Sequence, residues 1–107
     1  MADHAGVALE IDHDKVPFVS GARKYADMGT FAGGLFDNRS YFGPHVTFNE
    51  TIDEAGRMML FDPQTSGGLL LGVPEEQLEA FLKRATEEGQ PVWEIGKVME
   101  GKGIRVK

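Results

Sequence analysis

Apolar residues recur along the chain with two different spacings, which predict both strands and helices. Residues 7–11 alternate between apolar and mixed positions, as in a half-buried strand. Residues 74–88 carry an apolar stripe at positions i, i+3, i+4 and i+7, formed by Leu78, Phe81, Leu82 and Ala85. This stripe predicts an amphipathic helix that begins at Pro74 and ends before Gly89 and Pro91.

Four further segments have the composition of strands. Residues 69–73 are apolar on both faces and lie between a glycine and a proline, which predicts a strand buried on both sides. Residues 92–99 and 104–106 flank a glycine-containing turn, so we expect them to form a hairpin. Residues 46–48 predict a brief additional strand.

Two short helices are expected in the first half of the chain. Ser20 can cap a helix over residues 21–28, and Gly29 then fits the left-handed position that ends it. Residues 30–43 contain several glycines and show no clean period, so we interpret them as a loop with a short helical piece.

A capping box predicts another helix. Thr51 is followed three residues later by Glu54, and a helix over residues 52–60 should stop before Pro63. Strands that alternate with helices in this order predict an α+β fold, an α/β sandwich in which helices cover a mixed β-sheet. With 107 residues, the chain is expected to form a single domain over residues 1–107.

Charge and composition exclude several classes of function. The net charge is -6 and no Lys/Arg cluster interrupts the acidic character, which argues against a nucleic-acid partner. The chain has no cysteine, which excludes disulfides, a zinc ribbon and a thiol nucleophile. No apolar run is long enough to span a membrane, and the first residues do not resemble a signal peptide, so we expect a cytoplasmic protein without a membrane partner.

The most unusual segment is residues 61–68, between the third predicted helix and the strand predicted at residues 69–73. Thr65 and Ser66 offer hydroxyl groups, and Gly67 and Gly68 would let backbone N–H groups approach an anion such as phosphate or sulfate. Asp62 could bind a metal or orient a donor. The segment lacks the lysine and the following helix of a P-loop, so a tight turn that admits the chain to a crowded sheet remains the alternative.

The sequence Asp-Pro-Gln-Thr-Ser-Gly-Gly-Leu-Leu at residues 62–70 resembles the C-terminal motif of selenophosphate synthetases. Gly33-Gly34 followed by Asn38 resembles a second element of that family. Pro17, a short helix and then those glycines also keep the family's order, and the resemblance extends from about residue 5 to residue 106.

The resemblance implies an ATP-dependent enzyme of the superfamily that includes aminoimidazole ribonucleotide synthetase. Such enzymes make selenophosphate from selenide, ATP and water, and their N-terminal domain carries the reactive Cys or selenocysteine, a lysine, Mg²⁺-binding aspartates and the homodimer interface. None of these groups is found here, so we expect residues 1–107 to be the C-terminal domain alone. By itself it is expected to be inactive, without catalytic residues, metal ligands or tightly bound ATP. Its expected partner is its own N-terminal domain.

By the same resemblance, nine residues are expected to line one wall of the interdomain cleft. They would position substrate or phosphate and close the site against water. These residues are Asp62, Gln64, Thr65, Ser66, Gly67, Gly68, Gly33, Gly34 and Asn38.

Other features of the sequence leave room for alternatives. The three histidines are scattered, and we interpret Asp12-His13-Asp14 as an exposed turn, and His45 as a loop residue, instead of metal ligands. The aromatic-rich residues 31–48 suit a protein-interaction or anion-binding module as a second hypothesis. A thiamine-monophosphate or hydrogenase-maturation enzyme of the same superfamily is a third, against which the Thr-Ser-Gly-Gly run at residues 65–68 argues.

Overall fold

A mixed four-stranded sheet forms the centre of the molecule. The computed structural model describes all residues from 1 to 107. The strands are β1 (Ala8–Ile11), β2 (Val46–Phe48), β3 (Gly96–Met99) and β4 (Gly103–Val106). Their order is β2-β4-β1-β3, with β1 parallel to β4 and antiparallel to β3, and β2 parallel to β4. The predicted α+β class with a mixed sheet is therefore confirmed.

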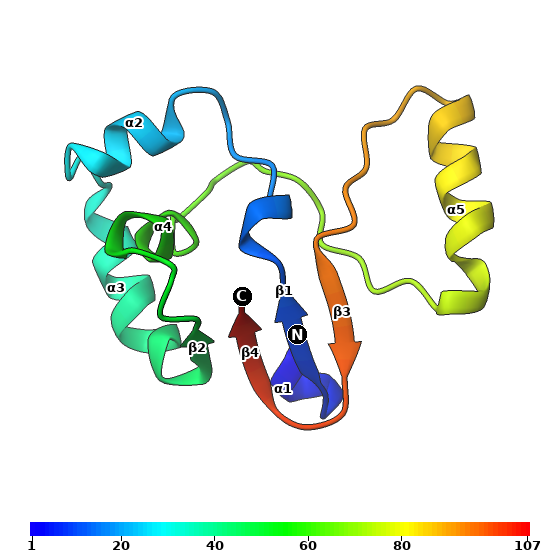
Figure 1. Cartoon of the computed structure of the whole chain (residues 1–107), viewed down its shortest axis with the longest axis horizontal. Coiled ribbons are helices and arrows are strands. Elements are labelled where there is room, and N and C mark those ends of the chain that lie inside the picture. The colour runs from blue at the N-terminus through cyan, green and yellow to red at the C-terminus, as the bar shows by residue number, and fades with distance from the viewer.

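Most of the helices lie beyond the two edges of this sheet. They are α1 (Ala2–Ala5), α2 (Ala22–Asp27), α3 (Gly33–Phe42), α4 (Glu54–Met59) and α5 (Glu75–Glu87), with 3-10 turns η1 (His13–Lys15) and η2 (Gly43–His45). Figure 1 shows α2, α3 and α4 gathered on the β2 side, whereas α5 stands beyond β3 at the end of two extended segments. No helix has the length and apolar character needed to cross a membrane.

The hydrophobic core lies among α3, α4 and β2. Leu35, Met58 and Phe61 are buried in one cluster, and Phe31, Val46 and Phe48 pack around it. The rings of Phe48 and Phe61 meet edge to face, with centroids 6.0 Å apart. Because Phe61 directly precedes Asp62, this core fixes the point where the candidate motif begins.

The helical piece predicted within the loop at residues 30–43 is much longer than expected, since most of this range is the ten-residue helix α3. Gly33 and Gly34 are the first two residues of this helix. At this end, the flexibility of glycine does not disturb any earlier turn of the helix. Leu35 on the next position is only 1% exposed, so burial of this side chain outweighs the weak helix propensity of the two glycines.

The buried strand predicted for residues 69–73 is also wrong. These residues form an extended connection between α4 and α5. The side chains of Leu69, Leu70 and Leu71 are 89%, 52% and 57% exposed. The segment has the apolar pattern of a strand, but a strand requires a hydrogen-bonded neighbour, and no other strand pairs with this segment.

The predicted hairpin is replaced by a different topology. β3 begins only at Gly96, and β1 lies between β3 and β4, so Ala8 is opposite both Met99 and Gly103. Gly101 and Gly103 have φ angles of 121° and 80°, which glycine alone adopts readily. These two glycines lie at the connection from β3 to β4, which passes the end of β1 at Ala8.

Two predicted helix caps also differ from the structure. Ser20 caps nothing, because α2 begins after Gly21 without a side-chain cap, although Gly29 has the expected left-handed φ of 70°. The cap of α4 is Asp53, whose Oδ1 accepts a hydrogen bond from the N–H of Gly56 at 2.9 Å. The hydroxyl of Thr51 donates to Asn49 instead.

The Asp53 carboxylate joins α4 to α2. The pKa of Asp53 is held below its usual value by the Gly56 N–H bond and by the hydrogen bond from the guanidinium of Arg23. Since the depressed pKa belongs to the folded state, this carboxylate stabilises the fold above the ordinary Asp pKa of about 3.9, and that contribution is lost as the pH falls through the lower, folded-state value.

We therefore expect Asp53→Asn to lower stability at neutral pH and to make little difference in acid. Asparagine keeps the cap but not the charge, so the change isolates the ionic part. Urea midpoints at pH 7, 5 and 3 measure it. Asp37→Asn, on the exposed side of α3, serves as the control; a difference at Asp53 that stays constant down to the lowest pH would contradict the assignment.

Candidate functional site

The motif at residues 62–68 lies on the surface immediately after the core. All seven residues are exposed, so the bend is open to solvent and not sealed in the interior. The N–H of Gln64 donates to the carbonyl of Asp62 at 3.0 Å, which turns the chain. The side-chain hydroxyls of Thr65 and Ser66 make no hydrogen bond within the chain, and both remain available to a ligand.

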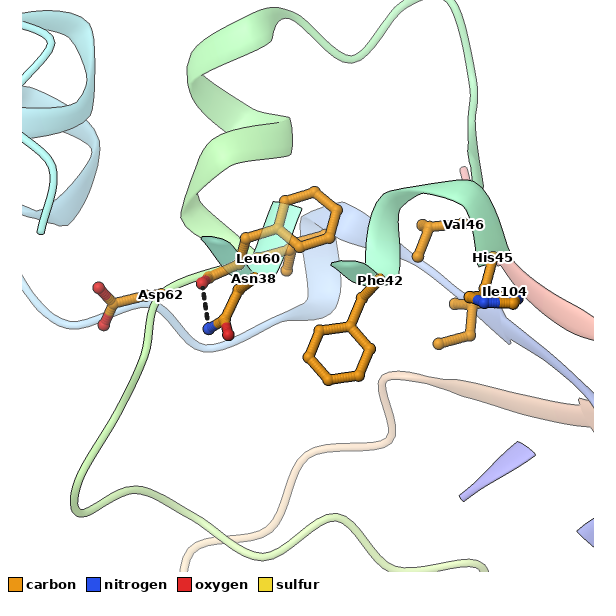
Figure 2. Close-up of a pocket in the computed structure, with 8 residues that line it drawn as sticks. Asn38, Phe42, His45, Val46, Leu60, Asp62 and Ile104 are labelled. Carbon is orange, nitrogen blue, oxygen red and sulfur yellow. Dashed lines mark hydrogen bonds between the residues drawn. The ribbon is translucent and has the colours of Figure 1, made fainter. Parts of the chain in front are cut away.

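Asn38 ties helix α3 to the start of this motif. Its amide Nδ2 donates to the carbonyl oxygen of Phe61 at 2.9 Å, the dashed line in Figure 2. A Cβ placed on Gly34 would lie 3.4 Å from Cγ of Pro63, so the first turn of α3 passes close to the motif as well. The structure thus brings Gly34 and Asn38 together with residues 61–63, across more than 20 positions of sequence.

The remaining candidate residues are less tightly grouped. The amide end of the Gln64 side chain lies beside Gly67 and would have to move to admit a Cβ there. Nothing lies within 4 Å of a Cβ built on Gly33 or Gly68. Residues 65–68 are therefore held only by their own turn, while residues 61–63 are held by α3.

A hollow of about 320 Å³ opens beside the Asn38–Phe61 contact. It is mostly apolar, with three polar side chains at its margin, and Figure 2 shows the Phe42 ring between the Asn38 side and the Ile104 side. Its lining residues are Asn38, Phe42, His45, Val46, Leu60, Phe61, Asp62 and Ile104. An apolar hollow with a few polar groups is the usual form of a small-molecule site.

Sequence reasoning missed most of this lining. For His45 the sequence favours a loop histidine over a residue that lines the cleft, whereas in the structure it lies in η2 and borders the hollow. Asn38 and Phe42 are four residues apart, so a helix places them on one face. The four-residue spacing indicates a shared face only if residues 30–43 are helical, and the sequence analysis interprets most of this range as a loop.

Histidine 13 also differs from its interpretation as part of an exposed turn. Its side chain is 14% exposed, its ring packs 5.4 Å from that of Phe18, and Nε2 lies 3.3 Å from the carbonyl oxygen of Gly56. The Asp14 side chain beside it is fully exposed. His13 therefore links η1 to α4.

The polar groups of the site are hydroxyls, amides and a single carboxylate. No group of three or more His, Cys, Asp or Glu side chains is placed to hold a cation, and Asp62 is the one carboxylate at the hollow. Arg39 of α3 pairs with Glu54 and also contacts the sulfur of Met58. The motif adds the hydroxyl groups of Thr65 and Ser66 as possible hydrogen-bond donors.

Replacing Asn38 by alanine is expected to lower the free energy of unfolding by about 1–2 kcal/mol, since the Phe61 carbonyl loses its side-chain donor. Thermal or urea denaturation followed by circular dichroism measures the loss. Asp37→Ala removes an adjacent side chain that makes no hydrogen bond, and it should change stability by less than about 0.5 kcal/mol. Equal effects of the two variants would show that the Asn38 bond does not hold the motif.

Comparison with known proteins identifies the family. The whole chain, residues 1–107, matches the family described as AIR synthase related protein, C-terminal domain. Proteins named selenide, water dikinase are similar over most of the chain. The one from Caldanaerobacter subterraneus subsp. tengcongensis is 42% identical over 88 residues, which is 82% of this chain and 25% of that protein.

Two other relatives of the same name give the same result. That of Carboxydothermus hydrogenoformans is 39% identical over 94 residues, 88% of this chain and 27% of the relative. That of Pelobacter propionicus is 40% identical over 103 residues, 94% of this chain and 29% of the relative. The chain thus spans between a quarter and a third of the length of these relatives. It belongs to the AIR synthase related family, as a C-terminal domain of the kind found in selenide, water dikinases.

Proposed function

We propose that this chain forms one wall of the active-site cleft of a selenide, water dikinase, which makes selenophosphate from selenide, ATP and water. The observation that carries the proposal is the exposed bend at residues 62–68, whose start is anchored by the Asn38–Phe61 contact and whose Thr65 and Ser66 hydroxyls are free. Hydroxyl and backbone N–H donors at such a bend suit phosphate oxygens. The chain matches only 25% of the length of a relative. This supports a cleft whose other wall is formed by the remaining part of a longer polypeptide.

The chemistry of phosphoryl transfer explains why the cleft would need a second wall from another domain. The reaction requires cations to neutralise several phosphate charges, whereas this chain carries a net charge of -6 and has no cluster of metal ligands. ATP and Mg²⁺ would therefore be held mainly by the N-terminal domain, which would also form the homodimer, in the cytoplasm. The residues of this chain would position oxygens and exclude water, and the chain alone is expected to be inactive.

The test is the double variant Thr65→Ala with Ser66→Ala in the full-length enzyme. Loss of two donors to a phosphate oxygen is expected to lower kcat about tenfold to a hundredfold while the fold survives. Selenophosphate or AMP formation measures the rate, and circular dichroism checks the fold.

The matched control is Ser20→Ala with Thr47→Ala, which removes two exposed hydroxyls elsewhere on the chain. This control should keep the full rate. Unchanged kinetics in the Thr65 and Ser66 variant would refute the role of the motif.

A protein-interaction module is the second candidate, and exposed aromatic side chains favour it. Phe36, Tyr41 and Phe42 on α3 are 52%, 75% and 50% exposed. Gel filtration with and without the synthetase N-terminal domain separates the two functions. Binding to an unrelated protein, without any binding to that domain, would favour the module.

A further inference from the structure

A second hollow, of about 260 Å³, opens on the surface where α3, α4 and β2 meet. It is distinct from the hollow beside Asn38, with which it shares only two apolar residues. Its lining combines two arginines, Arg39 and Arg57, with apolar side chains that include Phe48. No residue of the 62–68 motif borders it, so it is separate from the surface assigned to the cleft.

The guanidinium of Arg57 is held in place but keeps an unmatched charge. Its Nε donates to the carbonyl oxygen of Ile52 at 2.8 Å, and its Nη2 donates to that of Asn49 at 3.3 Å. Nη1 makes no hydrogen bond in the chain, and no carboxylate forms an ion pair with this arginine. The N–H groups of Nη1 and the second N–H of Nη2 therefore remain for another acceptor.

Aromatic rings give the hollow an apolar wall beside this charge. Cζ of Arg57 lies 5.6 Å from the centroid of the Phe48 ring, which is a cation–π contact. The Phe48 ring meets the ring of Phe61 edge to face, and Phe61 is buried in the core. Both the charge and the apolar wall are therefore preorganised, which lowers the entropy that a ligand must lose on binding.

Arg39 adds a second guanidinium, but its charge is already matched. It forms an ion pair with Glu54, the first residue of α4, and its Nη1 lies 3.2 Å from the sulfur of Met58. Together, Arg39, Arg57 and Glu54 leave one positive charge at the hollow. In a chain whose net charge is -6, this local surplus favours a ligand with a single negative charge.

We propose that this second hollow binds a small organic carboxylate with a flat apolar body, such as an aromatic acid. The carboxylate accepts hydrogen bonds from Arg57, because the planar guanidinium matches two carboxylate oxygens. The apolar body lies against Val46 and Phe48. A volume of about 260 Å³ lies just below the usual range for ligand sites, which suits a ligand with a single ring. This inference does not depend on the function proposed for residues 62–68.

Titration of the ¹⁵N-labelled chain with sodium benzoate, followed by amide chemical shifts, tests the proposal. Benzoate is expected to give saturable shifts centred on β2 and on Arg57, with a Kd of about 1 mM. Benzyl alcohol keeps the ring without the charge, and inorganic phosphate keeps the charge without the ring. Each should bind at least about tenfold more weakly.

Three results of this titration would overturn the proposal. The first is benzoate shifts that do not saturate by about 20 mM at constant ionic strength. The second is binding of benzyl alcohol or inorganic phosphate as tight as that of benzoate. The third is tighter binding of phenyl phosphate than of benzoate, which would assign the hollow to a phosphate ester.

Three variants test which charge binds the carboxylate. Arg57→Gln should weaken benzoate binding at least about tenfold, because the ligand loses its charged donor. Arg84→Gln removes an equal charge from the exposed helix α5 and should leave the affinity unchanged. Glu54→Gln releases Arg39 from its carboxylate and should tighten binding about twofold to fivefold, a gain that damage to the fold cannot produce. Equal affinities of the two arginine variants, or no gain in Glu54→Gln, would contradict the assignment.

Discussion

Leu35→Ala is expected to lower the free energy of unfolding by about 2–5 kcal/mol, the range for deleting a buried leucine side chain. Leu35 is 1% exposed and is the largest side chain that is completely buried. It packs against Met58 and Phe61, so the variant leaves a cavity where α3, α4 and the start of the motif meet. Only 10 of the 107 residues are buried, which makes this loss a large share of the total stability.

Urea denaturation followed by circular dichroism measures the effect of Leu35→Ala. Tyr41→Ala, on the same helix with a side chain 75% exposed, is the control and should cost less than about 1 kcal/mol. If both variants unfold at the same urea concentration, the cluster of Leu35, Met58 and Phe61 is not the core that holds the fold together.

Elements whose pattern is local were predicted correctly from the sequence. β1, β2 and α5 are three to thirteen residues long, and each lies within a residue or two of the range that its own pattern predicts. The left-handed Gly29 also followed from its position after a short helix. In these cases the residues of the segment itself decide its conformation.

Elements that depend on distant contacts were predicted poorly. The length of α3 was underestimated because burial of Leu35 outweighs the two glycines before it. The hairpin was wrong because β1, about 90 residues earlier in the chain, takes the place between β3 and β4. No period within residues 92–106 could reveal that insertion.

The candidate site divides in the same way. Residues 62–68 stand out in the sequence because hydroxyls and paired glycines are adjacent there. The contact between Asn38 and the Phe61 carbonyl joins residues 23 apart, and the hollow beside it is formed by α3, η2, β2, β4 and the segment that follows α4. Spacing alone could not indicate this hollow; the resemblance to a family placed Asn38 beside the motif, and the structure supplies the contact.

Gly96→Ala is the second change expected to have a large effect, about 3 kcal/mol or more of stability lost. A Cβ at this position would be driven into the backbone of β1, onto the carbonyl oxygen of Glu10 and to 3.1 Å from Cα of Ile11. Backbone atoms held in a sheet cannot move aside as a flexible side chain can, so β3 must separate from β1. Because β3 carries the end of the segment that includes α5, that whole part of the chain should loosen with it.

Gly72→Ala provides the matched comparison, since nothing lies within 4 Å of a Cβ built on Gly72 and its φ is not positive. There alanine restricts the unfolded chain without any clash, so a gain of up to about 1 kcal/mol is expected. Urea denaturation of both variants, together with hydrogen exchange of residues 96–99, gives the comparison. If Gly96→Ala is as stable as Gly72→Ala and its β3 amides stay protected, β1 and β3 cannot be paired in the register that sets Gly96 opposite Ile11.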